Sequence, residues 1–310
     1  MEKGYWSTLS NHRIQRRRAL AVSGSAALVT ALLAACGTSQ PAEPGLVTPA
    51  ADTSRQAKRG GVLKHSIATD GGSFDLSTQN LAVAPAVRMA NTVLLRFAPS
   101  ILAQPTTEIL PDLAESWEFS PDRTQLTMKL RPGVKWHNKA PVNGRTLDMD
   151  DVRFSIERAA RLGGSRTEIF AAANPQAPVG SITYPDSTTI VVKLQRPVYY
   201  TPALFANNIG GRVNIVPKET DSTFDIRRDM IGTGPYVLTN YATSVGYTFR
   251  RNPEFYDKSA GYIDEVEMPI VPEYSAALAQ FRRGNLYVFE GMRAEDVLPV
   301  KQDIPELNLY

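Results

Sequence analysis

The sequence has little of what metal and redox chemistry require. Its 310 residues include one cysteine, Cys36, and three histidines, His12, His65 and His137. A single thiol cannot form an internal disulfide, and no pair of histidines has the spacing of metal ligands. We therefore expect no metal site and no cofactor, and we interpret His65 and His137 as packed or hydrogen-bonded residues of strands.

An excess of charge of one sign is also missing from most of the chain. The formal net charge of +3 arises in the first 35 residues, which hold five basic groups and one acidic group and leave 29 basic and 30 acidic groups in the remainder. A near-neutral body lacks the basic surface that binds nucleic acid. Nucleic acid is therefore not an expected partner.

No hydrophobic run of bilayer-spanning length occurs in the N-terminal segment. The apolar stretch 19–35 is short for a membrane span and rich in small residues. It follows the basic cluster 13–18 and ends in Leu33-Ala34-Ala35-Cys36, the order of a signal peptide. This ending resembles the bacterial lipobox, in which the cysteine receives a diacylglyceryl group. We expect Cys36 to be lipidated and to anchor the chain in the periplasm or on the outer face of the cell membrane, after export by the Sec or the Tat route.

Beyond the cysteine, the composition changes twice. Residues 37–59 are rich in Pro, Ala, Thr, Ser and Gln and have few large apolar residues, which is typical of a flexible linker. From residue 60 onward, strand and helix patterns alternate, with both antiparallel and crossover connections. The fold class expected from this pattern is mixed α/β.

The periodicity of apolar residues predicts individual elements of this fold. Alternation predicts strands at 62–68 and 190–194, a hairpin around 117–136, paired strands at 235–241 and 245–250, and further strands at 266–271 and 286–289. Helical spacing predicts helices at 83–97, at 149–159 and at 276–281. Asp148 is the expected N-cap of the second helix, with Asp150 and Asp151 at the positive end of its dipole.

Three patterns resemble catalytic or phosphate-binding motifs. Helix capping is a better explanation of the first, and the other two do not match the motif they resemble. Helix capping explains the carboxylates at 148–151. The segment Gly71-Gly72-Ser73-Phe74-Asp75 lacks the final glycine of a nucleophile elbow. Gly232-Thr233-Gly234 continues into a strand, whereas a dinucleotide loop opens a helix. We therefore expect a protein that is not an enzyme.

Several motifs, in this order along residues 60–290, resemble those of the family 5 extracellular solute-binding proteins, the oligopeptide, dipeptide and nickel type of ABC importers. They include Gly71-Gly72-Ser73-Phe74-Asp75, Leu130-Arg131-Pro132-Gly133-Val134, Gly232-Thr233-Gly234-Pro235-Tyr236 and Asn252-Pro253-Glu254-Phe255-Tyr256. Tyr287 departs from the family pattern, because an acidic residue is often found at this position.

The resemblance implies a type II periplasmic-binding-protein fold of two lobes, with a subdomain inserted in the first lobe and the second lobe largely missing. The expected divisions are a signal peptide and lipobox at 1–36, a linker at 37–59, the first lobe at 60–98 and 181–272, the inserted subdomain at 99–180, and the start of the second lobe at 273–310. It also implies that Gln79, Asn80, Phe170, Asn208 and Arg212 lie near the ligand. The amides offer hydrogen bonds, Phe170 a stacking face, and Arg212 a charge-assisted bond to a carboxylate.

The implied function is the capture of a peptide or similar small solute outside the cell and its delivery to the permease subunits of an ABC transporter. The motifs do not separate a peptide from a nickel chelate, an opine or an oligosaccharide. Two alternatives are a lipid-anchored extracellular hydrolase and a binding module without a transport role.

Overall fold

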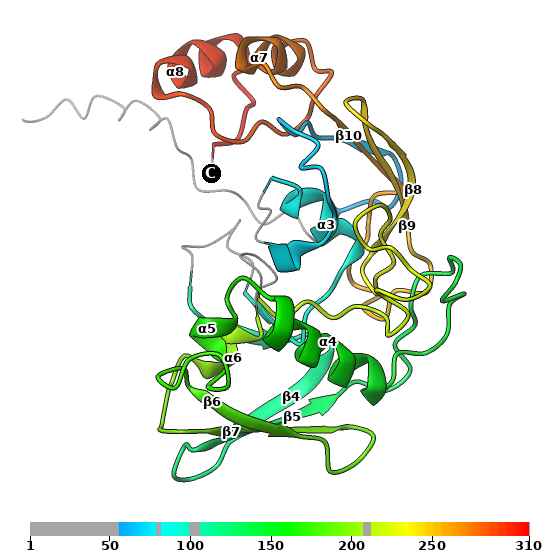
Figure 1. Cartoon of the computed structure of the whole chain (residues 1–310). Coiled ribbons are helices and arrows are strands. Elements are labelled where there is room, and N and C mark those ends of the chain that lie inside the picture. Colours follow the sequence, from blue (N-terminus) through cyan, green and yellow to red (C-terminus); the bar gives the residue numbers. More distant parts are fainter. Residues whose placement is uncertain (1–55, 79–81, 99–105, 207–211, 310) are drawn as a thin grey trace, which may run out of the picture. The chain divides into compact units, whose positions relative to one another are not determined.

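One four-stranded sheet joins the beginning of the described chain to its later part. The computed structural model describes residues 56–78, 82–98, 106–206 and 212–309 (Figure 1). The sheet has the order β1-β10-β9-β8, and β1 runs parallel to β10 while the other pairs are antiparallel. The strands are β1 (Val62–Lys64), β8 (Tyr236–Ala242), β9 (Gly246–Arg251) and β10 (Glu265–Pro269). The paired strands expected after residue 235 are confirmed as the β8–β9 hairpin.

The predicted helix at 83–97 is too long. Helix α3 (Ala84–Ala90) packs its apolar residues on the first sheet, but the chain then becomes extended and forms β2 (Leu95–Phe97), which pairs with β3 (Ile109–Pro111). The carbonyl oxygen of Ala90 accepts a hydrogen bond from Gly234 N at 2.8 Å, and that of Leu94 accepts one from Ala114 N at 2.8 Å. Long-range backbone hydrogen bonds therefore override the local helical spacing.

A second four-stranded sheet, of order β4-β5-β7-β6, is entirely antiparallel. Its strands are β4 (Ala114–Phe119), β5 (Gln125–Leu130), β6 (Val179–Thr183) and β7 (Thr189–Leu194). Leu126, Met128 and Leu130 of β5 are buried, as the period-two pattern predicts. The expected hairpin between β4 and β5 is confirmed.

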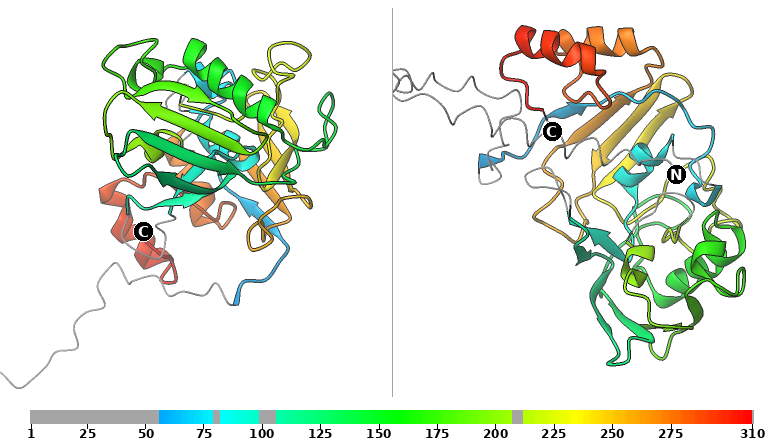
Figure 2. Two further views of the ribbon diagram at one scale, coloured as in Figure 1. Left: turned by 90° about the horizontal axis from the view of Figure 1, so that it is seen from below. Right: turned by 90° about the vertical axis from the view of Figure 1, so that its left-hand side faces the viewer.

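Helix α4 (Met149–Leu162) covers one face of the second sheet (Figure 2). The predicted cap is confirmed, because the side chain of Asp148 accepts a hydrogen bond from Asp151 N and the Asp151 side chain accepts one from Asp148 N, each at 3.0 Å. This reciprocal capping box satisfies two backbone donors at the start of the helix. Two short helices, α5 (Arg166–Ile169) and α6 (Thr201–Leu204), lie at the end of this sheet (Figure 1).

Two later helices pack on each other, with a small apolar cluster of their own. They are α7 (Tyr274–Arg282) and α8 (Ala294–Asp303), and the cluster includes Leu278, Phe281, Leu286 and Val300. Between them the chain returns to β1, where Tyr287 N donates to Lys64 O at 2.9 Å and Val288 forms a parallel bridge with His65. The domain divisions remain predictions. No helix in the described ranges is both long enough and apolar enough to traverse a bilayer.

The two sheets are connected through a buried contact between His137 and the loop 232–234. His137 Nε2–H donates to Gly234 O at 3.0 Å, and Gly232 N donates to His137 Nδ1 at 3.3 Å, so the ring is neutral. His137 is thus packed and hydrogen-bonded as expected, but it lies in a loop and not in a strand. The pKa of His137 is lowered to about 4, mainly by burial and also by the charge of Lys139, while the hydrogen bond to Gly234 and the charge of Asp229 oppose the shift.

We expect this histidine to make the fold less stable in mild acid. In the unfolded chain its pKa is about 6.5, so between pH 6.5 and pH 4 the unfolded state binds the additional proton. The contribution of His137 is complete above pH 6.5 and is lost as the pH falls toward 4, by roughly 3 kcal/mol in total. Urea unfolding at pH 7.5, 6, 5 and 4 measures this slope. His137→Gln should remove the slope between pH 6.5 and 5, and an unchanged slope in the variant would contradict the assignment.

Candidate ligand-binding site

Of the residues expected near a ligand, Phe170 and Arg212 lie within the described structure. Gln79, Asn80, Asn208 and the lipidation residue Cys36 lie outside the described residues. Phe170 follows α5, bridges to Val179 and is 6% exposed in the core of the second sheet. Its ring presents no open face in this structure, and its stacking role stays a prediction.

Arg212 lies at the surface beside exposed aromatic rings. Its guanidinium nitrogen is 3.5 Å from Glu168 Oε2. It lines a cavity of about 430 Å³ whose other walls are Phe97, Glu168, Tyr200, Ala203 and Leu204. Phe97 is 40% exposed and Tyr200 is 57% exposed, so both rings are open to a ligand. The position of Arg212 suits the charge-assisted bond that was expected of it.

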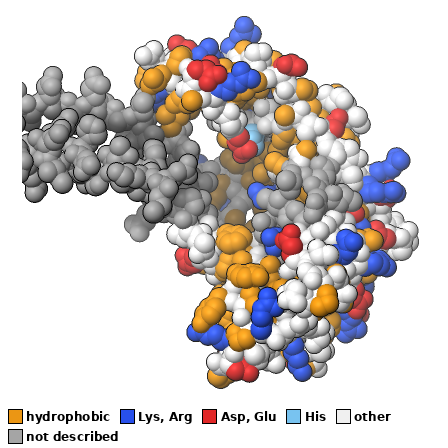
Figure 3. Space-filling model, turned by 60° about the vertical axis from the view of Figure 1, so that its left-hand side comes forward, with side chains coloured by type: hydrophobic (Ala, Val, Ile, Leu, Met, Phe, Trp, Pro, Cys, Tyr) orange, Lys and Arg blue, Asp and Glu red, His pale blue; other side chains and the backbone are white. Residues whose placement is uncertain are grey.

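A second cavity, of about 310 Å³, continues from the first at Phe97. It is lined on the α3 side by Arg88, Asn91 and Thr92, and elsewhere by Val93, Asp112 and Ala206. Because Phe97 lines both cavities, the ring separates one cationic group, Arg88, from another, Arg212. We call these three residues and Tyr200 the Phe97 face. Figure 3 shows the molecule hollowed on one side, with α7 and α8 above the hollow and hydrophobic and basic side chains together below it.

Charged groups from two other segments lie near the Arg88 end of this face. Glu290, which follows α7, has its Oε1 atom 3.7 Å from His65 Nε2. Burial lowers the pKa of the Arg88 guanidinium, and attraction to Glu290 opposes this shift. The chain after α7 therefore brings an acidic group, Glu290, near the basic group Arg88 of α3.

A buried arginine holds the segment that leads to Gln79 and Asn80. Arg158 of α4 donates two hydrogen bonds to the carboxylate of Asp75, at 3.1 and 2.7 Å, and one to Ser77 Oγ at 3.3 Å. Its remaining donors bond Asp221 at 2.7 and 3.0 Å. A planar guanidinium that bonds two carboxylates restricts both segments. Residues 75–77 are therefore fixed directly before the predicted amides.

The sequence patterns did not identify Arg88 or Phe97 as site residues. Phe97 was assigned to a helix, and an exposed arginine on a helix has no distinguishing pattern. The face offers cations, open rings and nearby acidic groups, which are the groups that bind a small polar solute noncovalently. Within the ranges that the structure describes, no group of three or more His, Cys, Asp or Glu side chains could hold a metal ion.

The sequence of this chain is similar to those of known solute-binding proteins. The sequence profile described as "Bacterial extracellular solute-binding proteins, family 5 Middle" matches residues 108–308. The dipeptide-binding protein of Escherichia coli strain K12 is 29% identical over 215 residues, which cover 64% of this chain and 39% of that protein. Heme-binding protein A of Haemophilus influenzae is 30% identical over 224 residues, covering 66% of this chain and 39% of that protein.

Solved structures of binding proteins resemble the fold of this chain. The periplasmic binding protein DppA of Helicobacter pylori, solved in complex with the peptide STSA, superposes with a TM-score of 0.69 at 24% identity and covers 80% of this chain and 50% of that chain. The mixed α/β, periplasmic-binding-protein-like fold is thereby confirmed. The chain spans about two fifths of the length of the curated relatives above. Since the family profile matches well over half of the sequence, this chain belongs to the family 5 bacterial extracellular solute-binding proteins.

Proposed function

We propose that this chain is the solute-binding component of an ABC transporter, which captures a peptide or similar small solute outside the cell and delivers it to the permease subunits. The observation that carries the proposal is the Phe97 face, with two arginines separated by open rings on a fold shared with a peptide-bound relative. Arginine suits a carboxylate and the rings suit apolar side chains, so a short peptide matches both.

Binding of this kind leaves the solute chemically unchanged. A ligand drives closure of two lobes only if it binds the closed state better than the open one. The groups of the Phe97 face supply contacts for one side of a solute, and the remaining contacts come from the opposing lobe of the fold.

Peptide binding is expected to depend on Arg212. Arg212→Gln should weaken binding of a di- or tripeptide by at least about tenfold, because a charge-assisted hydrogen bond contributes roughly 1.5–3 kcal/mol. Isothermal titration calorimetry with a small peptide panel measures the change. Arg228→Gln is the matched control, since the Arg228 side chain is 88% exposed and pairs only weakly with Asp225, at 3.7 Å, on a different part of the surface.

Two results would contradict the proposal. One is that no peptide binds or stabilises the protein in a thermal shift assay. The other is the appearance of cleaved peptide in the mixture by mass spectrometry, which would favour a hydrolase.

We also propose that the protein is held outside the cell by a lipid on Cys36, with residues 1–36 as the export signal and 37–59 as the tether. Cells that express the full chain with a radioactive fatty acid should yield a labelled protein that partitions into detergent. Cys36→Ser should remove the label without changing the fold, because the cysteine precedes the residues that the structure describes. A labelled Cys36→Ser protein would refute the anchor.

A further inference from the structure

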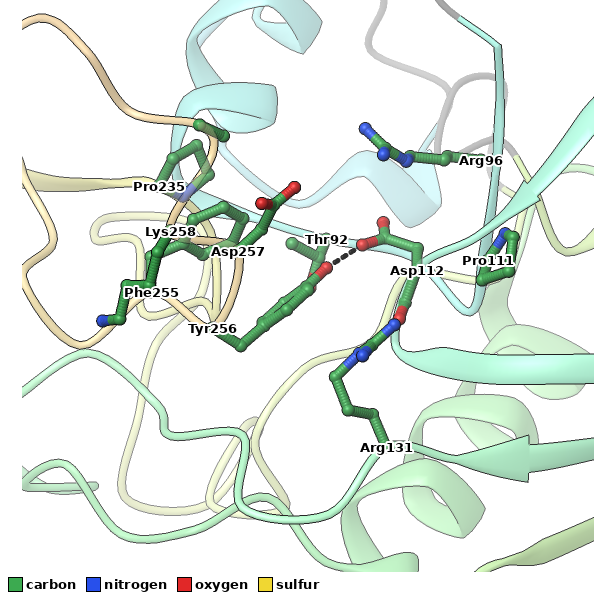
Figure 4. A pocket seen from close by; sticks show the side chains of 11 residues that line it. Thr92, Arg96, Pro111, Asp112, Arg131, Pro235, Phe255, Tyr256, Asp257 and Lys258 are labelled. Atoms are coloured by element: carbon green, nitrogen blue, oxygen red, sulfur yellow. Dashed lines mark hydrogen bonds between the residues drawn. The ribbon is translucent and has the colours of Figure 1, made fainter.

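A third cavity, of about 570 Å³, is lined by Arg96 of β2, Pro111 of β3 and the segment 255–258 (Figure 4). Consecutive strand residues point to opposite faces, so Arg96 enters this cavity while Phe97 lines the other two. Its size is within the range of small-molecule sites. The cavity adjoins the Arg88 cavity, since Thr92 and Asp112 line both, but it shares no lining residue with the Arg212 cavity. The residues that carry the following argument are Arg96, Arg131, Pro235, Phe255, Tyr256 and Asp257.

Opposite charges face each other across this cavity without contact. Figure 4 shows the guanidinium of Arg96 and the carboxylate of Asp257 directed toward one another, and the hydrogen bond drawn there joins Tyr256 to Asp112 instead. Hydrogen bonds from Ser259 lower the pKa of Asp257, and the charges of Arg96 and Arg131 lower it further. Asp257 is therefore ionised at neutral pH, and both groups line the same cavity.

The second arginine is held in place by its neighbours. Arg131 Nε donates to the backbone oxygen of Asp112 at 3.1 Å, and its guanidinium carbon lies 5.1 Å from the centre of the Tyr256 ring. A guanidinium that stacks on a ring keeps its edge available for a carboxylate. Arg131 is thus oriented beforehand, which reduces the entropy lost on binding.

The nearby acid, Asp112, is already occupied. Its carboxylate accepts hydrogen bonds from Tyr256 Oη and, at 3.3 Å, from Val93 N. Burial raises the pKa of Asp112, and the bond from Tyr256 opposes that shift. Asp257 accepts from Ser259 N and Oγ at its Oδ1 atom, so its Oδ2 atom is the acceptor offered to a ligand ammonium. Lys258 also lines the cavity but donates to Pro253 O at 2.8 Å, so the groups offered to a ligand carboxylate are the two arginines.

We propose that this cavity binds a small zwitterion of the α-amino acid type. Its carboxylate pairs with Arg96 and Arg131, and its ammonium pairs with Asp257. The rings of Pro235 and Phe255 supply an apolar wall for the side chain. Each charge of the ligand then has a partner of opposite sign, which is what partial burial of a charge requires.

The test compares L-leucine with two analogues that each lack one charge. Leucinamide has no carboxylate, and N-acetyl-leucine has no ammonium. Isothermal titration calorimetry on the intact chain should show leucine binding, with each analogue at least about tenfold weaker.

Arg96→Gln should weaken leucine binding by a similar factor and leave peptide binding unchanged. Arg250→Gln, a change at an exposed arginine of β9 whose side chain is 72% exposed, is the matched control and should change neither.

Three outcomes would overturn the proposal: no binding of leucine, equal binding of leucine and both analogues, or leucine binding that Arg96→Gln leaves intact. In the third case, leucine binding that is weakened by Arg212→Gln would show that leucine binds at the Phe97 face. Asp257→Asn is a second variant, expected to weaken leucine more than N-acetyl-leucine. Circular dichroism verifies that each variant is folded. Failure of peptide binding leaves the proposal standing, because the two sites share none of the residues tested.

Discussion

Replacing Asp151 by alanine is expected to lower the free energy of unfolding by about 3–5 kcal/mol, because it leaves an arginine and several buried donors without their acceptor. The Asp151 side chain is 0% exposed. It accepts two bonds from Arg145, at 2.7 and 2.6 Å, and one from Trp136 Nε1 at 3.1 Å. It also accepts backbone bonds from Asp148 N and Lys218 N, each at 3.0 Å.

These bonds connect the start of α4 to two distant segments. Arg145 also bonds Glu219, at 2.9 and 2.7 Å, and the bonds to Asp151 are the main reason that the pKa of Arg145 is raised. Asp151→Ala removes the acceptor that Trp136, Arg145 and the backbone of Lys218 share, and the Trp136 donor stays buried. An unpaired buried donor loses its bond to water and gains none in the protein.

Asp150→Ala is the matched control. Asp150 is the preceding residue of the same helix, but its side chain is 67% exposed and lies 3.9 Å from Arg153, so the expected change is below about 1 kcal/mol. Guanidinium unfolding, followed by circular dichroism, measures both variants. Equal stability of the two variants would show that the buried network does not hold the helix.

Gly232→Ala is expected to lower the free energy of unfolding by at least about 3 kcal/mol, because no space exists for a methyl group. A Cβ atom at this position would lie 2.0 Å from Ala90 O and 2.4 Å from Asn91 Oδ1. Both atoms belong to the end of α3, and the nearer one is backbone. The helix end and the loop 232–234 would have to separate.

That separation breaks hydrogen bonds as well as packing. Gly234 N donates to Ala90 O at 2.8 Å, and His137 N donates to Gly232 O at 2.9 Å. Loss of two buried bonds adds roughly 1 kcal/mol each. The displacement of α3 also reaches Arg88, so the variant should bind peptide less well if it folds.

Gly180→Ala provides the comparison at another glycine. Its Cβ would meet nothing nearer than 3.4 Å, so we expect a change within about 1 kcal/mol. Thermal unfolding monitored by circular dichroism distinguishes the two glycines. A Gly232→Ala protein as stable as Gly180→Ala would mean that α3 and the loop do not pack as described.

Local patterns predicted elements well where the residues around them agree with the pattern. The alternation of β5 and the cap at Asp148 are satisfied by neighbours within a few residues or on the adjacent strand. The helix predicted at 83–97 failed because contacts with residues more than a hundred positions away determine where it ends. Long-range contacts also explain the incomplete prediction for Asp151. Its place as an acidic residue at the start of the helix was expected, but its hydrogen bonds from Trp136 and Lys218 were not.

The sequence by itself determined the mixed α/β class, the family through its ordered motifs, and the expectations of an export signal, because these depend on residue types and on short spacings. The tertiary structure alone decided that Phe97 and Tyr200 are exposed while Phe170 is buried, and that Arg88 and Arg212 line adjoining cavities. Exposure and convergence depend on how separate segments pack, and chain spacing carries no information about distances between segments that meet only in the folded state.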